Sequence, residues 1–195
     1  MKIGTIEKLC KSAKRILIVN DKERCIQWIS DGYCMYPLFK LPKLNAENIF
    51  AIFDIPEDKQ GKIQFDVRDD FPVSLNFGDV DGAEYVITPD AYSINANGIT
   101  LVPFRCSLGV MLIDKKYLGV FDGEVTFYER CTSVGRPYLV AKEGLFISGV
   151  ILPYMADYKL SEWLVNTGEG VDTMLHNHRG EDDEDLFDED ELDEE

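Results

Sequence analysis

The feature that most constrains this chain is a sequence pattern that occurs twice, roughly 66 residues apart, with small insertions between the copies. Residues 47–54 match residues 115–122, and a short apolar alternation follows each copy, at 63–65 and 125–127. Self-similarity at this period predicts one supersecondary unit used twice, with the two open faces stacked on each other. The other matched pairs are 29–38 with 94–104, 72–75 with 137–140, and 86–89 with 150–153.

The composition predicts a globular protein without a membrane span. The chain has 195 residues, of which 45% are hydrophobic and 11% aromatic, enough to bury a core in one or two small domains. No apolar run approaches the ~20 residues of a membrane helix, and the first residues do not form a signal segment. Five cysteines, none in a CxxC pair, favour neither a disulfide framework nor a zinc knuckle. We therefore expect a reducing, cytoplasmic location.

The charge is concentrated at the C-terminus. Of the 36 acidic residues, 12 lie among residues 181–195, so the remaining 24 face 20 lysines and arginines. A run of like charges this dense repels itself and buries too little apolar surface to order, so it predicts a disordered acidic tail. Two interpretations stay open: a solubilising tail, or a partner-binding or nucleic-acid-mimicking tail anchored by Leu186 and Phe187.

Hydrophobic periodicity predicts short helices and many strands. The spacing of Ile6, Leu9, Cys10 and Ala13 predicts an amphipathic helix over 5–15, and Asn45 is a suitable cap for a second helix that ends at Pro56. A third helix is predicted over 114–121. The predicted strands and hairpins lie at 16–19, 25–30, 33–38, 62–67, 73–77, 84–88, 91–104 (turning on Asn97-Gly98), 124–129, 138–142 and 145–153.

These elements predict an α+β fold with antiparallel sheets on one side and short helices on the other. The repeat divides the chain into a first domain at 1–89 and a second, shorter domain at 90–155. A C-terminal helical segment at 156–180 and the disordered tail at 181–195 complete the predicted organisation.

Several segments resemble the sliding clamps that act as DNA polymerase processivity factors. The run IDKKYLGVF, then EVTFYE, PYLVAKEG and GVILPY, is similar to the closing stretch of a bacterial-type clamp. SDGYCMYPL resembles the hairpin of a clamp's first domain, and NAENIFAIFDIPEDKQGKIQFDV its second helix and following strand. The resemblance covers most of residues 1–154, no single motif in it is diagnostic, and both units are shorter than clamp domains. It implies repeated units that form a ring, with sheets outside and helices lining a hole for duplex DNA, and a phage or prophage replication gene.

The resemblance assigns the DNA contacts to cations on helices. A clamp needs only a loose positive lining, because lysine and arginine near phosphates release counterions while the ring stays free to slide. The alternative is that these cations form an ordinary solvated helix face. The residues expected to face DNA are Lys8, Lys11, Lys14, Arg15, Lys115 and Lys116.

The same resemblance implies two kinds of partner besides DNA. Copies of the chain are expected to form a homo-oligomer, and a DNA polymerase and other replication proteins are expected to bind through short peptides. The expected peptide groove consists of Val86, Leu152, Pro153 and Tyr154.

Residues that carry catalysis or bind cofactors are scarce. The two histidines, His176 and His178, have no nearby cysteine, so a metal site is not expected. No Ser-His-Asp or Cys-His set stands out, and 168–170 lacks the lysine and the preceding strand of a phosphate loop. We expect no enzymatic activity and no cofactor.

Two other function classes stay open at this stage. One is a single-stranded DNA-binding replication accessory protein whose acidic tail recruits partners, which requires exposed aromatics along a cationic groove. The other is a structural or interaction protein without DNA contact. A strict monomer would count against the ring, and salt-sensitive binding to short single strands would favour the accessory protein.

Overall fold

The computed structural model describes residues 2–96 and 98–154. The chain divides into a compact unit that ends at residue 155 and a second stretch over 156–195. The predicted helical segment 156–180, the tail 181–195 and the turn residue Asn97 lie outside the described residues. All of the described helices and strands belong to the first unit.

The predicted α+β class is confirmed, with a large mixed sheet and a few short helices. The helices are α1 (Ile3–Ala13), α2 (Ala46–Ile52), α3 (Glu57–Gln60) and α4 (Lys115–Leu118). The strands are β1 (Arg15–Asp21), β2 (Ile26–Ser30), β3 (Cys34–Leu38), β4 (Gln64–Arg68), β5 (Tyr85–Ile87), β6 (Ile94–Ala96), β7 (Ile99–Cys106), β8 (Gly109–Asp114), β9 (Thr126–Cys131), β10 (Pro137–Glu143) and β11 (Phe146–Ile151).

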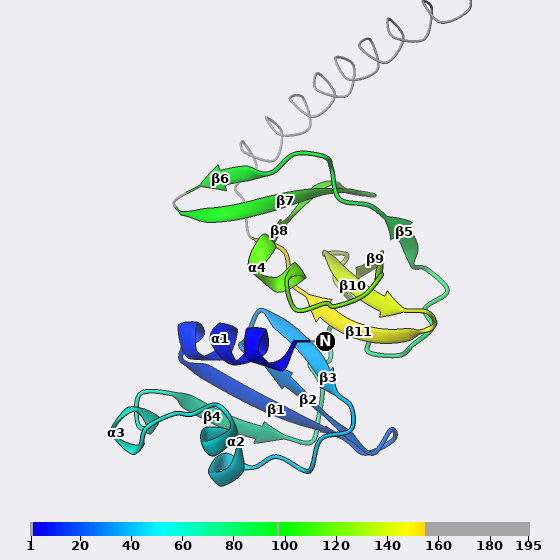
Figure 1. Cartoon of the computed structure of the whole chain (residues 1–195). Helices are drawn as coiled ribbons and strands as arrows, with labels where there is room; N and C mark the ends of the chain where they lie inside the picture. Colours follow the sequence, from blue (N-terminus) through cyan, green and yellow to red (C-terminus); the bar gives the residue numbers. More distant parts are fainter. Residues whose placement is uncertain (1, 97, 155–195) are drawn as a thin grey trace, which may run out of the picture. The chain divides into compact units, whose positions relative to one another are not determined.

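Eight strands form one sheet in the order β4-β1-β2-β3-β11-β10-β9-β5, and β6, β7 and β8 form a second sheet. The large sheet is arranged symmetrically about its central antiparallel pair, β3 with β11 (Figure 1). On one side, α1 precedes the antiparallel meander β1-β2-β3, and on the other, α4 precedes the meander β9-β10-β11. The fold therefore contains a helix followed by three antiparallel strands, twice.

This arrangement differs from the repeat inferred from the sequence. Residues 29–38 form the end of β2 and all of β3 in the large sheet, whereas the matched residues 94–104 form β6 and most of β7 in the small one. Likewise β4 pairs in parallel with β1, whereas its match β9 lies between two antiparallel neighbours. The matched segments have similar local patterns but different partners, because hydrophobic alternation specifies a strand and not its neighbour.

Both faces of the large sheet are covered, and the helices pack on one of them (Figure 1). On that face, apolar side chains of α1, α2 and α4 share a core with alternate residues of the strands, including Ile16, Ile18 and Tyr36. At Gly149 of β11, a Cβ atom would lie 3.0 Å from ring atoms of Tyr36 and Phe121, so this close packing requires glycine. The predicted domain boundary at 89/90 falls between β5 and β6, and residues from both sides of it enter this core.

The opposite face is covered by residues 69–84, which we call the crossing segment. It leaves β4 at one edge of the sheet and reaches β5 at the other edge. Its Phe71 and Phe77 rings stack at 4.3 Å, and both pack edge-on against Trp28 of β2. The strand predicted at 73–77 is wrong, because these residues lack a strand partner and bury Phe77 instead.

One local prediction is confirmed by hydrogen bonds, and the limits of another are corrected. Asn45 caps α2 through a reciprocal pair with Asn48, at 3.0 and 2.6 Å. The first helix lies at 3–13 rather than 5–15, because Lys14 adopts a left-handed conformation (φ 53°) that ends it before β1. Within the described ranges, none of the helices combines the length and apolarity needed to cross a bilayer.

Candidate functional site

The lysines of α1 differ in their availability to a ligand. Ile6, Leu9 and Cys10 turn one side of the helix into the core, and Lys8 and Lys14 remain exposed. Lys11 is half-buried and forms an ion pair with Glu7 at 2.7 Å, one helical turn earlier. Two of the three predicted lysines on this helix are thus solvent-exposed and have no ion pair to another described residue.

Arg15 does not belong to the helical set, and this part of the prediction is wrong. It is the first residue of β1, where side chains alternate between the two faces of the sheet. The side chains of Ile16 and Ile18 face the helices. The Arg15 side chain therefore points to the opposite face of the sheet, where it lies against the turn at Gly32. The helix ends too early to carry it.

The second pair of predicted cations lies on α4, which has a single turn. Lys115 is exposed, whereas Lys116 forms an ion pair with Asp114 at 3.0 Å and lies over the ring of Tyr117. Asp114 also caps the helix by accepting a hydrogen bond from the Lys116 backbone at 3.1 Å. Lys115 is therefore the available cation on this helix.

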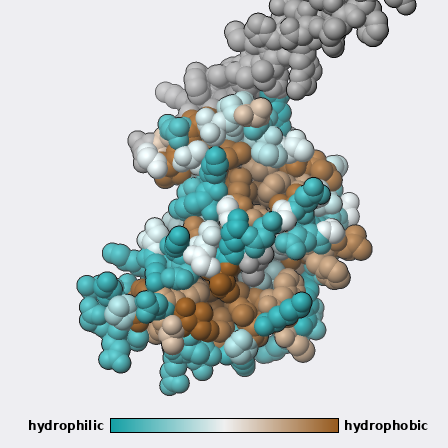
Figure 2. Space-filling view, viewed as in Figure 1, coloured by the Kyte–Doolittle hydropathy of each residue, from teal (hydrophilic) through white to brown (hydrophobic). Residues whose placement is uncertain are grey.

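The fold brings α1 and α4 to the same face of the sheet. The backbone N–H of Lys2 donates to the carbonyl of Val120 at 2.8 Å, which ties the start of α1 to the residues after α4. Tyr36 of β3 donates its hydroxyl to the Tyr117 carbonyl at 2.9 Å. Figure 2 shows this face as a mixture of hydrophilic and hydrophobic residues rather than a continuous hydrophilic surface.

Beneath the two helices lies a buried polar group centred on Asp31. Its carboxylate accepts hydrogen bonds from the backbone of Tyr33 and Cys34, at 2.9 and 3.1 Å, and so fixes the β2–β3 turn. Burial and the nearby Asp31 charge raise the pKa of Cys10 to about 12, and burial raises the pKa of Cys34 and Tyr117 well above their usual values. The side chains of Cys10, Cys34 and Tyr117 therefore stay protonated at neutral pH and contribute to the packing of the central strands.

The structure brings together only part of the predicted peptide groove. Leu152, Pro153 and Tyr154 continue from β11, and the Tyr154 backbone donates to the carbonyl of Leu112 in β8 at 2.7 Å. Val86 lies on the edge strand β5, separated from β11 by β9 and β10. Val86 is exposed but belongs to a different part of the surface.

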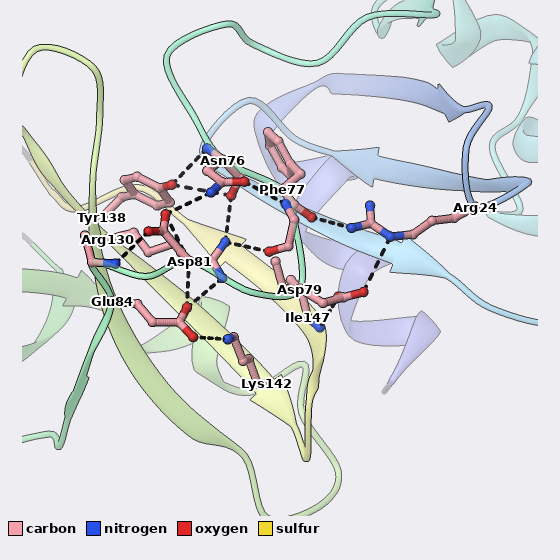
Figure 3. A network of polar contacts seen from close by, with 12 residues as sticks. Arg24, Asn76, Phe77, Asp79, Asp81, Glu84, Arg130, Tyr138, Lys142 and Ile147 are labelled. Atoms are coloured by element: carbon pink, nitrogen blue, oxygen red, sulfur yellow. Dashed lines mark hydrogen bonds and ion pairs between the residues drawn. The ribbon is translucent and has the colours of Figure 1, made fainter.

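A buried ionic network that sequence analysis did not predict joins the crossing segment to the large sheet (Figure 3). Arg130 of β9 donates twice to Glu84, at 2.8 and 2.6 Å, and also to the carbonyls of Asn76 and Gly78. Lys142 of β10 donates to the second oxygen of Glu84. The Arg130 side chain is 0% exposed, so the network replaces water around the guanidinium.

The charges of this network are matched in the folded protein. Burial opposes ionisation of Glu84, but hydrogen bonds from Lys142 and Arg130 outweigh burial and hold its pKa below the usual value. Asp81, which accepts from the Ala83 backbone and from Asn76, also has a lowered pKa. A signal was present in the sequence: Lys142 follows Tyr138 and Val140 with the period of a buried strand face, so it needed a buried partner.

A second arginine bonds the middle of the crossing segment from the other half of the sheet. Arg24, in the turn after β1, donates to the Phe77 carbonyl and to Asp21, both at 2.8 Å. Asp79 accepts a hydrogen bond from the Ile147 backbone of β11 at 3.0 Å. The segment is thus bonded to both halves of the sheet (Figure 3).

The described part of the chain has several surface cavities. One of about 430 Å³ lies between the turn after β1 and the connection from β3 to α2. A neighbouring one of about 650 Å³ lies beside the crossing segment, and one of about 450 Å³ lies between 89–93 and α4. Residues 2–96 and 98–154 contain no group of three metal-ligating side chains, and His176 and His178 lie outside these ranges.

Comparison of this chain with protein-family models, with curated proteins and with solved structures gave no match in any of the three searches.

Proposed function

We propose that this protein is a sliding-clamp-like processivity factor that forms a homo-oligomeric ring around duplex DNA. The observation that carries the proposal is one continuous sheet with α1 and α4 on the same face. The exposed lysines Lys8, Lys14 and Lys115 lie on or next to these helices. Such a face offers DNA phosphates a few cations without base-specific contacts, which suits a protein that must slide.

The two edges of the sheet supply a route to the ring. Within the described residues, β4 and β5 end the strand order and each pairs with a single neighbour. A strand with an unpaired side is a template for pairing with another chain. If β4 of one copy pairs with β5 of the next, every contact is head-to-tail, and such contacts close into a ring when the rotation per copy permits.

Partner proteins are assigned to the end of β11 in this proposal. Leu152 and Pro153 are half-buried and Tyr154 is 41% exposed, so a short apolar peptide can cover them. We assign Val86 to the edge where copies meet, because β9 and β10 separate it from this stretch. The DNA polymerase and other replication proteins are the expected partners.

The test is topological. The purified protein is loaded with a replication extract onto nicked circular DNA, and retention is compared before and after the circle is linearised. A ring is retained on the circle and slides off the linear ends, whereas a protein that binds phosphates from one side is lost equally from both. Light scattering at high protein concentration that returns a monomer, or equal loss from both DNA forms, would contradict the proposal.

The contacts are tested with charge-reversed variants. We expect the Lys8→Glu, Lys14→Glu, Lys115→Glu triple variant to lose retention on circular DNA, with its oligomeric state unchanged. The matched control replaces three exposed cations outside α1, α4 and the edge strands: Lys40→Glu, Lys59→Glu and Arg136→Glu. If both triple variants were retained equally on circular DNA, the lysines of α1 and α4 would not be the residues that contact DNA.

A further inference from the structure

The cavity of about 430 Å³ beside β2 combines an apolar floor with a cationic rim. Its walls are the turn between β1 and β2 and the connection between β3 and α2. Ile26, Leu38, Leu41 and Pro42 contribute the apolar lining. Leu41 is 41% exposed, and the neighbouring Phe39 is 49% exposed, so apolar surface faces water here.

The walls of this cavity are fixed to each other by a buried glutamine. The Gln27 side chain accepts from the Leu44 backbone at 2.6 Å and donates to the Leu44 carbonyl at 3.1 Å. It also donates to Asn20 at 2.8 Å, which ties the connection to the end of β1. Asn48 of α2 donates a side-chain hydrogen bond to the Lys43 carbonyl, with a donor–acceptor distance of 2.8 Å. A ligand would therefore meet a site formed in advance, which lowers the ordering cost of binding.

Three exposed lysines, Lys22, Lys40 and Lys43, stand on the rim. Asp69, which does not line this cavity, pairs with Lys22 at 2.9 Å, and hydrogen bonds from Lys22 and Asn20 lower its pKa. The carboxylate that does line the cavity, Asp21, is buried and bonded to Arg24. The rim is thus cationic on a chain whose formal net charge is −16.

We propose that this cavity binds an acidic peptide segment with adjacent apolar side chains, supplied by a partner protein. The carboxylates pair with Lys40 and Lys43, and the apolar side chains cover Leu41 and Pro42. Nucleic acid is the less suitable occupant, because none of the cavity's described lining residues is an aromatic that could stack a base. The inference does not depend on ring formation or on the contacts of α1 and α4.

The test uses a fluorescein-labelled peptide, Glu-Asp-Leu-Phe-Asp-Glu, with binding followed by fluorescence polarisation. Because this peptide has the sequence of residues 184–189, every binding measurement uses the full chain with Leu186→Ser and Phe187→Ser, which removes the competing copy. We expect saturable binding that weakens as salt rises, since exposed ion pairs are screened. The Lys40→Glu, Lys43→Glu variant should weaken it by roughly tenfold, because two exposed ion pairs are lost and charge repulsion takes their place. The Leu41→Asp variant should weaken it as well, and a peptide with serines in place of Leu-Phe should bind worst.

The matched control is the Lys59→Glu, Lys62→Glu variant, because both lysines are exposed and neither lines the cavity. It should bind the peptide within about twofold of the original chain, allowing for long-range charge effects. Absence of saturable binding up to about 1 mM peptide, or equal weakening in both double variants, would overturn the proposal. Displacement of the peptide by an oligothymidine strand at equal concentration would identify a nucleic-acid site instead.

Discussion

Arg130 has the smallest exposed fraction, 1%, of the charged residues that the structure describes as buried. The charge of its guanidinium is neutralised by Glu84, and the guanidinium also donates hydrogen bonds to two carbonyls of the crossing segment. We predict that Arg130→Met lowers the free energy of unfolding by about 3–5 kcal/mol, because it leaves Glu84 buried beside Lys142 alone. Urea unfolding followed by circular dichroism measures the change.

The control for this prediction is Arg136→Met, an exposed arginine in the turn between β9 and β10. Its free energy of unfolding should stay within about 0.5 kcal/mol of the original protein. A loss of similar size in both variants would mean that the network of Arg130 does not stabilise the fold.

Glu84 makes the same network sensitive to acid. Its pKa is lowered in the folded state from an ordinary value of 4.5, so the unfolded chain binds the proton more readily. Its contribution to stability is therefore complete above about pH 4.5 and is lost as the pH falls through the folded-state pKa. We predict that Glu84→Gln is less stable than the original protein at pH 7 and that the difference narrows at pH 3, as measured by urea unfolding at both pH values. A difference that is constant with pH would contradict this account.

At the scale of single residues, sequence analysis predicted which lysines are exposed better than it predicted which charged residues contact each other. The exposed positions of Lys8, Lys14 and Lys115 agree with the predicted helix faces. The network around Arg130 could not be predicted, because Arg130 and Glu84 are 46 residues apart and meet only through the path of the crossing segment. Arg15 was misplaced because the helix ends two residues earlier than predicted, at Ala13, which puts Arg15 in β1.

At the scale of elements, the crossing segment is held chiefly by one apolar anchor. Phe77 is 5% exposed and contacts both Trp28 and Phe71. We predict that Phe77→Ala destabilises the protein by about 3–5 kcal/mol and opens residues 69–84 to proteases before the strands. Limited proteolysis with mass spectrometry locates the first cut.

Val80→Ala is the control for this prediction, because Val80 lies in the same segment and is 80% exposed. Its first cut should appear at the rate of the original protein. First cuts in α1 or the β6–β8 sheet of Phe77→Ala would indicate that the crossing segment is not the part that opens.

Most strands could be predicted from alternation and turn residues, since β2, β3, β10 and β11 lie within two residues of their predicted limits. The strand β8 was missed, because its residues Gly109–Asp114 were divided between a loop and the following helix. The strand predicted at 73–77 has alternating apolar residues but packs over a sheet instead of joining one. Periodicity identifies the buried side of a segment and does not show whether backbone or side chains make the contact.

At the scale of the whole molecule, the edges of the large sheet control assembly in the proposed ring. Val67 on β4 is 47% exposed and Val86 on β5 is 61% exposed, so both tolerate substitution in a single copy. We predict that Val67→Asp and Val86→Asp each shift the protein toward monomers without a loss of stability beyond about 0.5 kcal/mol. Light scattering coupled to size exclusion measures the mass.

The control for this prediction is Val73→Asp, since Val73 is 100% exposed in the crossing segment, away from the edge strands. It should assemble like the original protein. A protein that is monomeric before any substitution, or oligomers that survive both edge variants, would remove β4 and β5 as the assembly surfaces.

The order of strands in the sheet was beyond sequence analysis. The central pairing of β3 with β11 joins residues more than 110 positions apart, and only two residue pairs define its register. The parallel pairing of β1 with β4 depends on a long connection through α2 and α3. Such contacts are selected by the packing of the finished core, and no local pattern along the chain encodes them.

The crossing segment also has a mechanical consequence. It joins the two outermost strands of an eight-stranded sheet, a width of roughly 34 Å at the usual strand spacing. Arg24 and Arg130 bond the middle of the segment, at Phe77 and Asn76, to the two halves of the sheet. The segment therefore links the two halves across the back of the sheet, so a force that separates them has to break these bonds as well.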